Sequence, residues 1–235
     1  MNILAFDTCL GAVSVAVRWQ GPGGDWLTRH AHEARERGHA ERLIPMMTEV
    51  MDEAGLAFSD LHRIAVTVGP GTFTGVRVGM AAARGIALAA GLAVVGTTTL
   101  AVMAHQADQL LGPARRGDRL LAVAVDARRG SVYLQLFSGA REEAGPPLLL
   151  AADDAVRHIG QRSVIVVGSG GDLLADAIRA ARGQVEAALA SLQPDARSLA
   201  LLAADLIPAS PLRPLYLRPP DVKPQADLSL PRAIP

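Results

Sequence analysis

Two aspartates, Asp7 and Asp126, occupy matching positions in the sequence. Each is expected to end a β-strand at a tight turn, where a carboxylate can bind a metal ion or a phosphate-bound cation. In a protein of two lobes the pair would face one cleft, which makes it a candidate site for Mg-ATP. Turn formation alone is the alternative, because Asp side chains readily hydrogen-bond to nearby backbone groups.

A second candidate for nucleotide binding is the glycine-rich junction at residues 166–172. Gly168 and Gly170 lie where a strand is expected to lead into a helix, so they could approach a nucleotide base or sugar. An ordinary connection between two elements is the alternative. Together with the two aspartates, these glycines are predicted to form the remnant of a nucleotide site. Such a remnant could bind ATP or ADP weakly. No cofactor is expected to be required.

The most distinctive stretch, residues 69–79, reads Gly-Pro-Gly-Thr-Phe-Thr-Gly-Val-Arg-Val-Gly. It follows an expected strand and opens a helix, so its backbone N–H groups could face an anion. It is not a Walker A loop, because no Gly-Lys-Ser/Thr follows, and its glycines miss the dinucleotide-binding spacing by one residue. Residues 61–107 contain no Asp or Glu, so the acid that binds ribose in dinucleotide sites is also missing.

Two helices, over residues 43–54 and 74–88, are predicted to form an interface with a partner. Small residues in the second helix would let another helix approach closely, and the methionines of the first adapt to irregular surfaces. Packing inside the chain's own core is the alternative for both. The predicted interface residues are Leu43, Met46, Met47, Val50, Met51, Val76, Met80, Ala83 and Ala87.

Catalytic residues and metal ligands are not predicted. The six histidines never form the His-x3-His pair that puts two metal ligands on one helix face. The sequence has no Gly-x-Ser-x-Gly elbow, and Cys9 has no catalytic framework around it.

The elements that must position these residues alternate between strands and helices, which predicts an α/β protein. Strands are expected at residues 2–7, 12–19, 26–31, 64–68 and 92–95, and helices at 74–90 and 98–111. A further helix should end near residue 54. Because proline fits only the first turn of a helix, this one is expected to become regular from about Pro45.

The same plan begins again with strands expected at 120–125 and 132–137. Aligning residues 3–13 with 122–132 matches Asp7 to Asp126 and Gly11 to Gly130. Two lobes of one design are therefore predicted, although short apolar strands also align by chance. The expected lobes are residues 1–110 and 111–217, followed by a proline-rich tail at 218–235, and a helix at 195–207 is expected to pack back on the first lobe.

Composition favours a globular protein. The chain has 235 residues, of which 50% are hydrophobic, and its 23 basic and 23 acidic side chains cancel. No overall charge therefore attracts the chain to nucleic acid or to an anionic membrane. The single cysteine, the lack of a signal peptide and the shortness of the longest apolar stretch favour the cytoplasm.

Five segments, at residues 2–8, 39–45, 69–79, 125–133 and 214–218, together resemble the TsaB family, formerly called YeaZ, of the Gcp-like group. The stretch at 69–79 is the most specific of them, and the resemblance runs from residue 1 to about 218. It implies a two-lobed actin/Hsp70/sugar-kinase-like (ASKHA) fold with ribonuclease H-like lobes.

The resemblance also implies a function. Members are non-catalytic subunits required to form N6-threonylcarbamoyladenosine (t6A) in tRNA, and they pair with and activate the transferase TsaD. The ATPase TsaE joins the pair, homodimers form when members are alone, and tRNA is reached through the complex. TsaD binds a metal through a His-x3-His motif that this chain lacks, and the family's older M22 peptidase label is not carried over.

The sequence is also compatible with two other functions. The first is an ASKHA-type phosphotransferase or ATPase that uses Asp7 and Asp126 around Mg-ATP. The second is the metalloprotease that the older label suggests.

Overall fold

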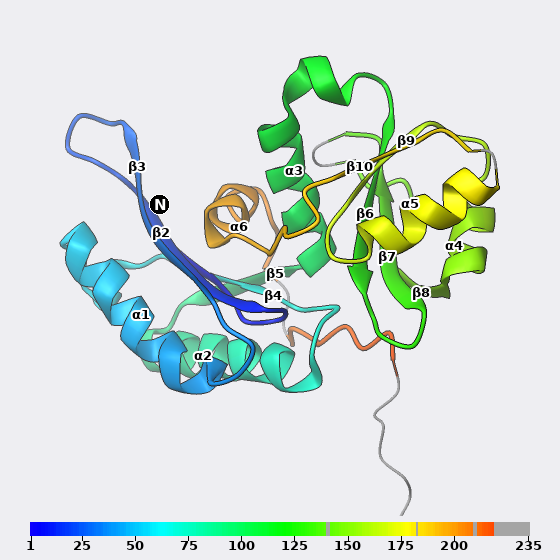
Figure 1. The fold of residues 1–235 in the computed structure, drawn as a ribbon. Coiled ribbons are helices and arrows are strands. Elements are labelled where there is room, and N and C mark those ends of the chain that lie inside the picture. Colours follow the sequence, from blue (N-terminus) through cyan, green and yellow to red (C-terminus); the bar gives the residue numbers. More distant parts are fainter. Residues whose placement is uncertain (140–141, 182, 209–210, 219–235) are drawn as a thin grey trace, which may run out of the picture.

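The computed structural model describes residues 1–139, 142–181, 183–208 and 211–218. Two five-stranded sheets, with the strand orders β3-β2-β1-β4-β5 and β10-β9-β6-β7-β8, form two lobes that lie side by side (Figure 1). The predicted two-lobed α/β fold is confirmed, and both sheets have the ribonuclease H-like order. No helix among the described residues is long and apolar enough to span a membrane.

The first sheet is a three-stranded antiparallel meander extended by two parallel strands. Its strands are β1 (Ile3–Asp7), β2 (Ala12–Gln20), β3 (Trp26–Ala34), β4 (Arg63–Thr67) and β5 (Ala93–Thr97). β1 pairs with β2 in antiparallel and with β4 in parallel orientation, and β4 continues to β5 in parallel. A 3-10 turn at Phe58–Asp60 precedes β4.

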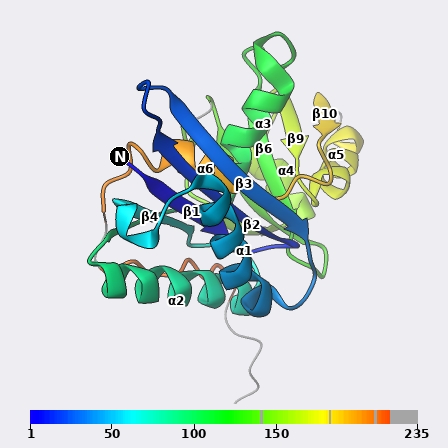
Figure 2. The ribbon, with the colours of Figure 1, turned by 90° about the vertical axis from the view of Figure 1, so that its left-hand side faces the viewer.

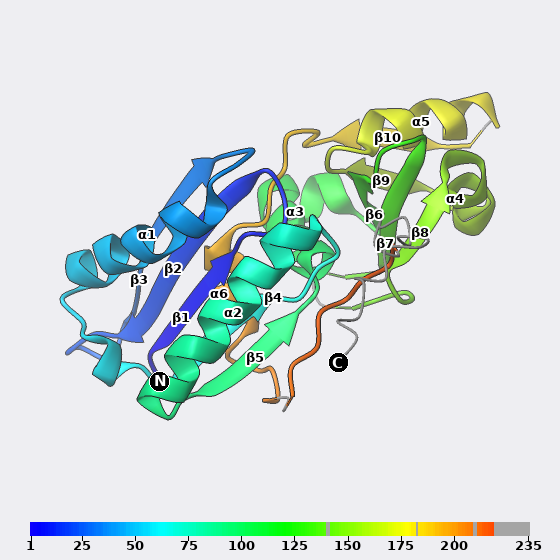
Figure 3. The same ribbon diagram turned by 90° about the horizontal axis from the view of Figure 1, so that it is seen from below.

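Helices cover both faces of this sheet because its strands alternate apolar side chains between the two faces. Leu4 and Phe6 pack beneath α1 (His39–Ala54) and α2 (Phe73–Ala90), which cross one face side by side (Figures 2 and 3). Ile3 and Ala5 face the other way and pack against α6 (Ala196–Leu202).

The second sheet repeats this design. Its elements are β6 (Leu120–Asp126), β7 (Ser131–Phe137), β8 (Leu148–Ala151), α4 (Ala152–Ile159), β9 (Val164–Val167), α5 (Gly171–Ala180) and β10 (Val185–Ala188). β6, β7 and β8 form the meander, whereas β9 and β10 run parallel to β6. α4 and α5 cover one face, and α3 (Thr99–Arg116), which leads from the first lobe into the second, covers the other.

Several element boundaries differ from the prediction. α1 begins at His39, which places Pro45 inside the helix, and burial of Leu43 in the core accompanies this early start. α3 extends to Arg116 across a break at Gly112, where a link was expected. The last helix ends at Leu202 instead of residue 207, and Arg63 donates hydrogen bonds to the backbone carbonyls beyond its end.

Residues 211–218 form an extended segment, here called the strap, beside α2 (Figure 3). The Leu215 N–H donates to the Val68 carbonyl over 2.7 Å, and the Tyr216 ring lies 5.3 Å from that of Phe73. Leu212 packs against the first lobe's core and Leu217 against the second lobe's. The predicted tail beyond residue 218 lies outside the described residues.

Candidate functional site

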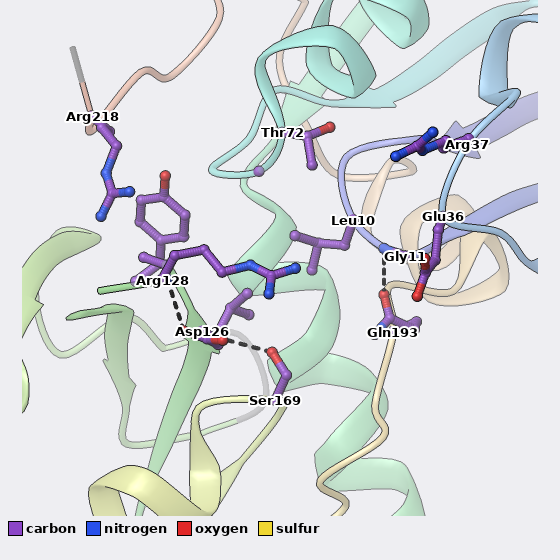
Figure 4. Close-up of a pocket in the computed structure, with 14 residues that line it drawn as sticks. Leu10, Gly11, Glu36, Arg37, Thr72, Asp126, Arg128, Ser169, Gln193 and Arg218 are labelled. Atoms are coloured by element: carbon purple, nitrogen blue, oxygen red, sulfur yellow. Dashed lines mark hydrogen bonds between the residues drawn. The ribbon is translucent and has the colours of Figure 1, made fainter. Parts of the chain in front are cut away.

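A cleft of about 600 Å³ opens between the lobes (Figure 4). Loops from both lobes and the end of the strap build its walls. The lining residues are Leu10, Gly11, Glu36, Arg37, Gly71, Thr72, Val125, Asp126, Ala127, Arg128, Tyr133, Ser169, Gln193 and Arg218. This volume suits a small-molecule ligand or part of a larger one.

Asp126 lies in this cleft, at the end of β6. Its Oδ1 accepts a hydrogen bond from the Arg128 N–H over 2.7 Å, and its own N–H donates to Ser169 Oγ over 3.1 Å (Figure 4). One carboxylate oxygen of Asp126 therefore stabilises the β6–β7 turn. This agrees with turn formation, the alternative to cation binding. The carboxylate is nevertheless exposed to the cleft.

Asp7 does not reach the cleft, which corrects the expectation that the two aspartates face each other there. Its side chain is 0% exposed. The Thr67 hydroxyl donates to Oδ2, and the Cys9 N–H donates to Oδ1 over 3.2 Å. Burial raises the pKa of the Asp7 carboxyl to about 6, although both hydrogen bonds act to lower it. Burial also raises the pKa of the Cys9 thiol.

The distinctive stretch at 69–79 covers the turn between β1 and β2. A side chain at Gly71 would place its Cβ 2.3 Å from the Cys9 carbonyl oxygen, and one at Gly75 would lie 2.0 Å from that of Thr8. The Thr72 N–H donates to the Cys9 carbonyl over 2.8 Å, while Thr72 Oγ1 caps α2 by accepting from the Gly75 N–H. These glycines therefore permit the close backbone contact under which Asp7 is buried.

Gly168 and Gly170 also permit close packing, against β6 and Val132. The Gly168 backbone has φ 95°, and a Cβ there would lie 2.5 Å from the Ala124 carbonyl oxygen. A Cβ at Gly170 would lie 2.9 Å from Val132 Cγ1. Neither glycine lines the cleft, whereas Ser169 between them does. Of the four residues predicted for the nucleotide remnant, only Asp126 lines the cleft.

Sequence reasoning missed most of the residues that do line the cleft. Arg37 precedes α1, Arg128 lies in the β6–β7 turn, and Arg218 ends the strap. Gln193 joins the walls by accepting a hydrogen bond from the Gly11 N–H over 2.9 Å. The one available signal was the pair of arginines that begins two residues after Asp126, where the strand ends.

The nine predicted interface side chains are buried in the chain itself, which corrects that prediction. All of them are at most 8% exposed. Most pack α1 and α2 onto the first sheet, and Val76 and Met80 pack beside Cys9. Core packing, the alternative considered from the sequence, therefore accounts for these positions. The residues are Leu43, Met46, Met47, Val50, Met51, Val76, Met80, Ala83 and Ala87.

The opposite faces of the same helices are open. Ile44 on α1 is 51% exposed, and Leu88 on α2 is 87% exposed. Ala81 and Gly85 lie along the same side of α2 as Leu88, at helical spacing, and are also exposed. This outer face combines an exposed leucine with small residues that would let another helix come close.

Comparisons with known proteins agree on one family. The sequence model of TsaD, tRNA N6-adenosine threonylcarbamoyltransferase, matches residues 32–189. The tRNA threonylcarbamoyladenosine biosynthesis protein TsaB of Escherichia coli is 40% identical over 146 residues, which cover 62% of this chain and 58% of that protein. The chain thus spans little more than half the length of this relative.

Two longer matches extend over nearly the whole chain. An uncharacterized protein of Mycobacterium tuberculosis is 36% identical over 234 residues, covering 96% of this chain and 95% of that protein. A crystal structure from Pseudomonas aeruginosa, described as similar to peptidase YeaZ, is 31% identical with a TM-score of 0.75. It covers 92% of this chain and 99% of that one.

Proposed function

Since this chain belongs to the Gcp-like family of TsaD and TsaB (YeaZ) proteins, we propose that it is a non-catalytic subunit for forming t6A in tRNA. It would pair with and activate a TsaD-type transferase. The observation that favours a subunit over an enzyme is the cleft: the buried carboxyl of Asp7 is unavailable there, and Asp126 uses one oxygen to form its own turn.

The proposed partner surface is the outer face of α1 and α2. Leu88 is exposed in the unpaired chain, so covering it with another apolar surface would be favourable. The small side chains of Ala81 and Gly85 allow a neighbouring helix to approach closely. The same face would form a homodimer when the chain is alone, a TsaE-type ATPase would join the heterodimer, and the complex would act in the cytoplasm without a membrane.

The test is co-purification of this chain with TsaD from the same organism, followed by a reconstituted tRNA-modification assay. Leu88→Glu should abolish pairing and modification together, because it places a charge in the covered face. Leu110→Glu is the matched control, since Leu110 is 61% exposed on α3, away from this face. Modification that proceeds equally without the chain would refute the proposed function, and unchanged pairing of folded Leu88→Glu would refute the surface.

The phosphotransferase alternative has less support. It requires Asp7 and Asp126 around one cation, but Asp7 is buried beneath the 69–75 loop. The metalloprotease alternative needs a ligand set, and the described residues contain no group of three His, Cys, Asp or Glu that could hold a metal ion. As a non-catalytic subunit, the chain would require no cofactor of its own.

A further inference from the structure

Three arginine side chains in the inter-lobe cleft are left without protein partners. Within the described part of the chain, Arg37, Arg128 and Arg218 make no hydrogen bond or ion pair through their guanidinium groups. Figure 4 shows the Arg128 side chain extending across the cleft toward Leu10, with Arg37 on one side and Arg218 on the other. Three separate elements therefore bring unpaired cations to one recess.

Several other arginines of the chain are paired with carboxylates. Arg42 is held between Glu33 and Glu49, and Arg197 pairs with Asp195. The cleft also contains the carboxylates of Glu36 and Asp126, but neither forms a salt bridge with the three arginines. Guanidinium groups that converge without a carboxylate partner are available to an anion from outside the chain.

The backbone of the β6–β7 turn gives independent support for a role of Arg128. Arg128, Arg129 and Gly130 have φ values of 68°, 55° and 70°. Side chains disfavour this left-handed conformation, and glycine or asparagine would adopt it at lower cost. Arg128 adopts a backbone conformation that arginine disfavours, and its long cationic side chain lies in the cleft. This combination indicates that the side chain has a functional role there.

We propose that Arg37, Arg128 and Arg218 bind the phosphate backbone of the RNA substrate, an inference that rests on the proposed function. Guanidinium groups pair well with phosphate oxygens. Their placement on three elements suits successive phosphates of a strand better than one compact polyphosphate. The Mg-nucleotide arrangement of the phosphotransferase alternative would also need the carboxyl of Asp7, which is buried. Because the whole chain has no net charge, this local cluster must supply the attraction.

The polar groups between the arginines fit the same ligand. Thr72 and Ser169 place hydroxyls on opposite walls of the cleft, and Gln193 adds an amide. Such groups can bind sugar hydroxyls or base edges while the arginines fix the position of the backbone. The proposed contact is thus one RNA strand at the mouth of the cleft, not a nucleotide enclosed within it.

The test is a binding titration of the full chain with a fluorescein-labelled anticodon stem-loop RNA, with Mg-ATP as a separate probe. Arg128→Gln should weaken RNA binding about tenfold, as expected for one lost charge-assisted contact. Arg129→Gln, which changes the same charge at the next residue outside the cleft lining, should weaken it less than twofold. The triple variant R37Q/R128Q/R218Q should reduce the slope of log affinity against log salt by about 2.

Several outcomes would refute the proposed RNA-binding site. These are no RNA binding by the natural chain at low salt, equal losses in Arg128→Gln and Arg129→Gln, or an unchanged triple variant that circular dichroism shows to be folded. Arg128-dependent binding of Mg-ATP without RNA binding would assign the cleft to a nucleotide instead. In the reconstituted assay, a chain that binds RNA through the cleft but is dispensable for modification would refute only the proposed function.

Discussion

Asp7 should make the stability of the first lobe depend on pH. Its carboxyl is fully buried, and burial raises its pKa to about 6 from the usual 3.8. The folded chain therefore holds this proton more tightly than the unfolded chain does. Replacing the residue by asparagine removes the titration and keeps the shape. The amide oxygen can accept from the Cys9 N–H, and the amide nitrogen can donate to the Thr67 hydroxyl, which now donates to Asp7.

The sign and size of the effect follow from proton binding. Between pH 3.8 and about 6 the folded state binds more protons than the unfolded state, so the free energy of unfolding falls as pH rises. The contribution is complete below the unfolded pKa and is lost as pH rises through the folded pKa. A difference of roughly 2 pH units corresponds to about 3 kcal/mol.

The assay is urea unfolding of the natural chain and of Asp7→Asn at several pH values from about 4 to 7.5. Over this range, which starts just above the unfolded pKa, the natural chain should lose about 2.5 kcal/mol relative to the variant. The lowered pKa of His30 also affects the profile, but that residue is present in both proteins and its effect cancels. Parallel profiles for the two proteins would show that Asp7 is already ionised in the fold and would refute the reasoning.

Two matched pairs of substitutions test the packing of α1 and α2. Met47→Glu buries a charge at a fully buried position and should cost at least ~4 kcal/mol of unfolding free energy. Ile44→Glu, half exposed on the same helix, should change the unfolding free energy of the dilute, monomeric chain by less than ~0.5 kcal/mol. Equal effects of the two substitutions on thermal unfolding of the monomer would contradict the burial described. Gly75→Ala should destabilise the chain by about 3 kcal/mol because its Cβ would meet the Thr8 carbonyl. Gly85→Ala has open space around it in the single chain and should stabilise the dilute, monomeric chain by about 0.5–1 kcal/mol. A stable Gly75→Ala would mean that the loop does not pack as described.

The two similar lobes could be predicted because short sequence patterns specify them. Apolar strands that end in an aspartate and a glycine turn occur twice at corresponding positions, around Asp7 and Asp126. Each half then folds by the same rules, and the two sheets have equivalent strand orders. Elements short enough to lack such a pattern, such as β8 and β10, were missed.

The surroundings of individual side chains were less predictable, because they depend on distant segments. Helical spacing shows that Met47 and Met80 lie on apolar faces, but it cannot tell whether the chain's own sheet or a partner covers those faces. Asp7 is buried by a loop more than 60 residues away in sequence. The arginines of the cleft are ordinary loop residues until the fold brings three distant loops together.

The strap also limits how the two lobes can move. The chain crosses between them three times: through α3, through the segment from β10 to α6, and through the strap, which packs Leu212 on one core and Leu217 on the other. Two bodies joined by a single tether can swivel freely, whereas three separate tethers restrict their rotation. Tyr216 rests on Phe73 at the start of α2, and Arg218 follows in the cleft. Any rotation that opens the cleft must therefore also pull on the first turn of α2.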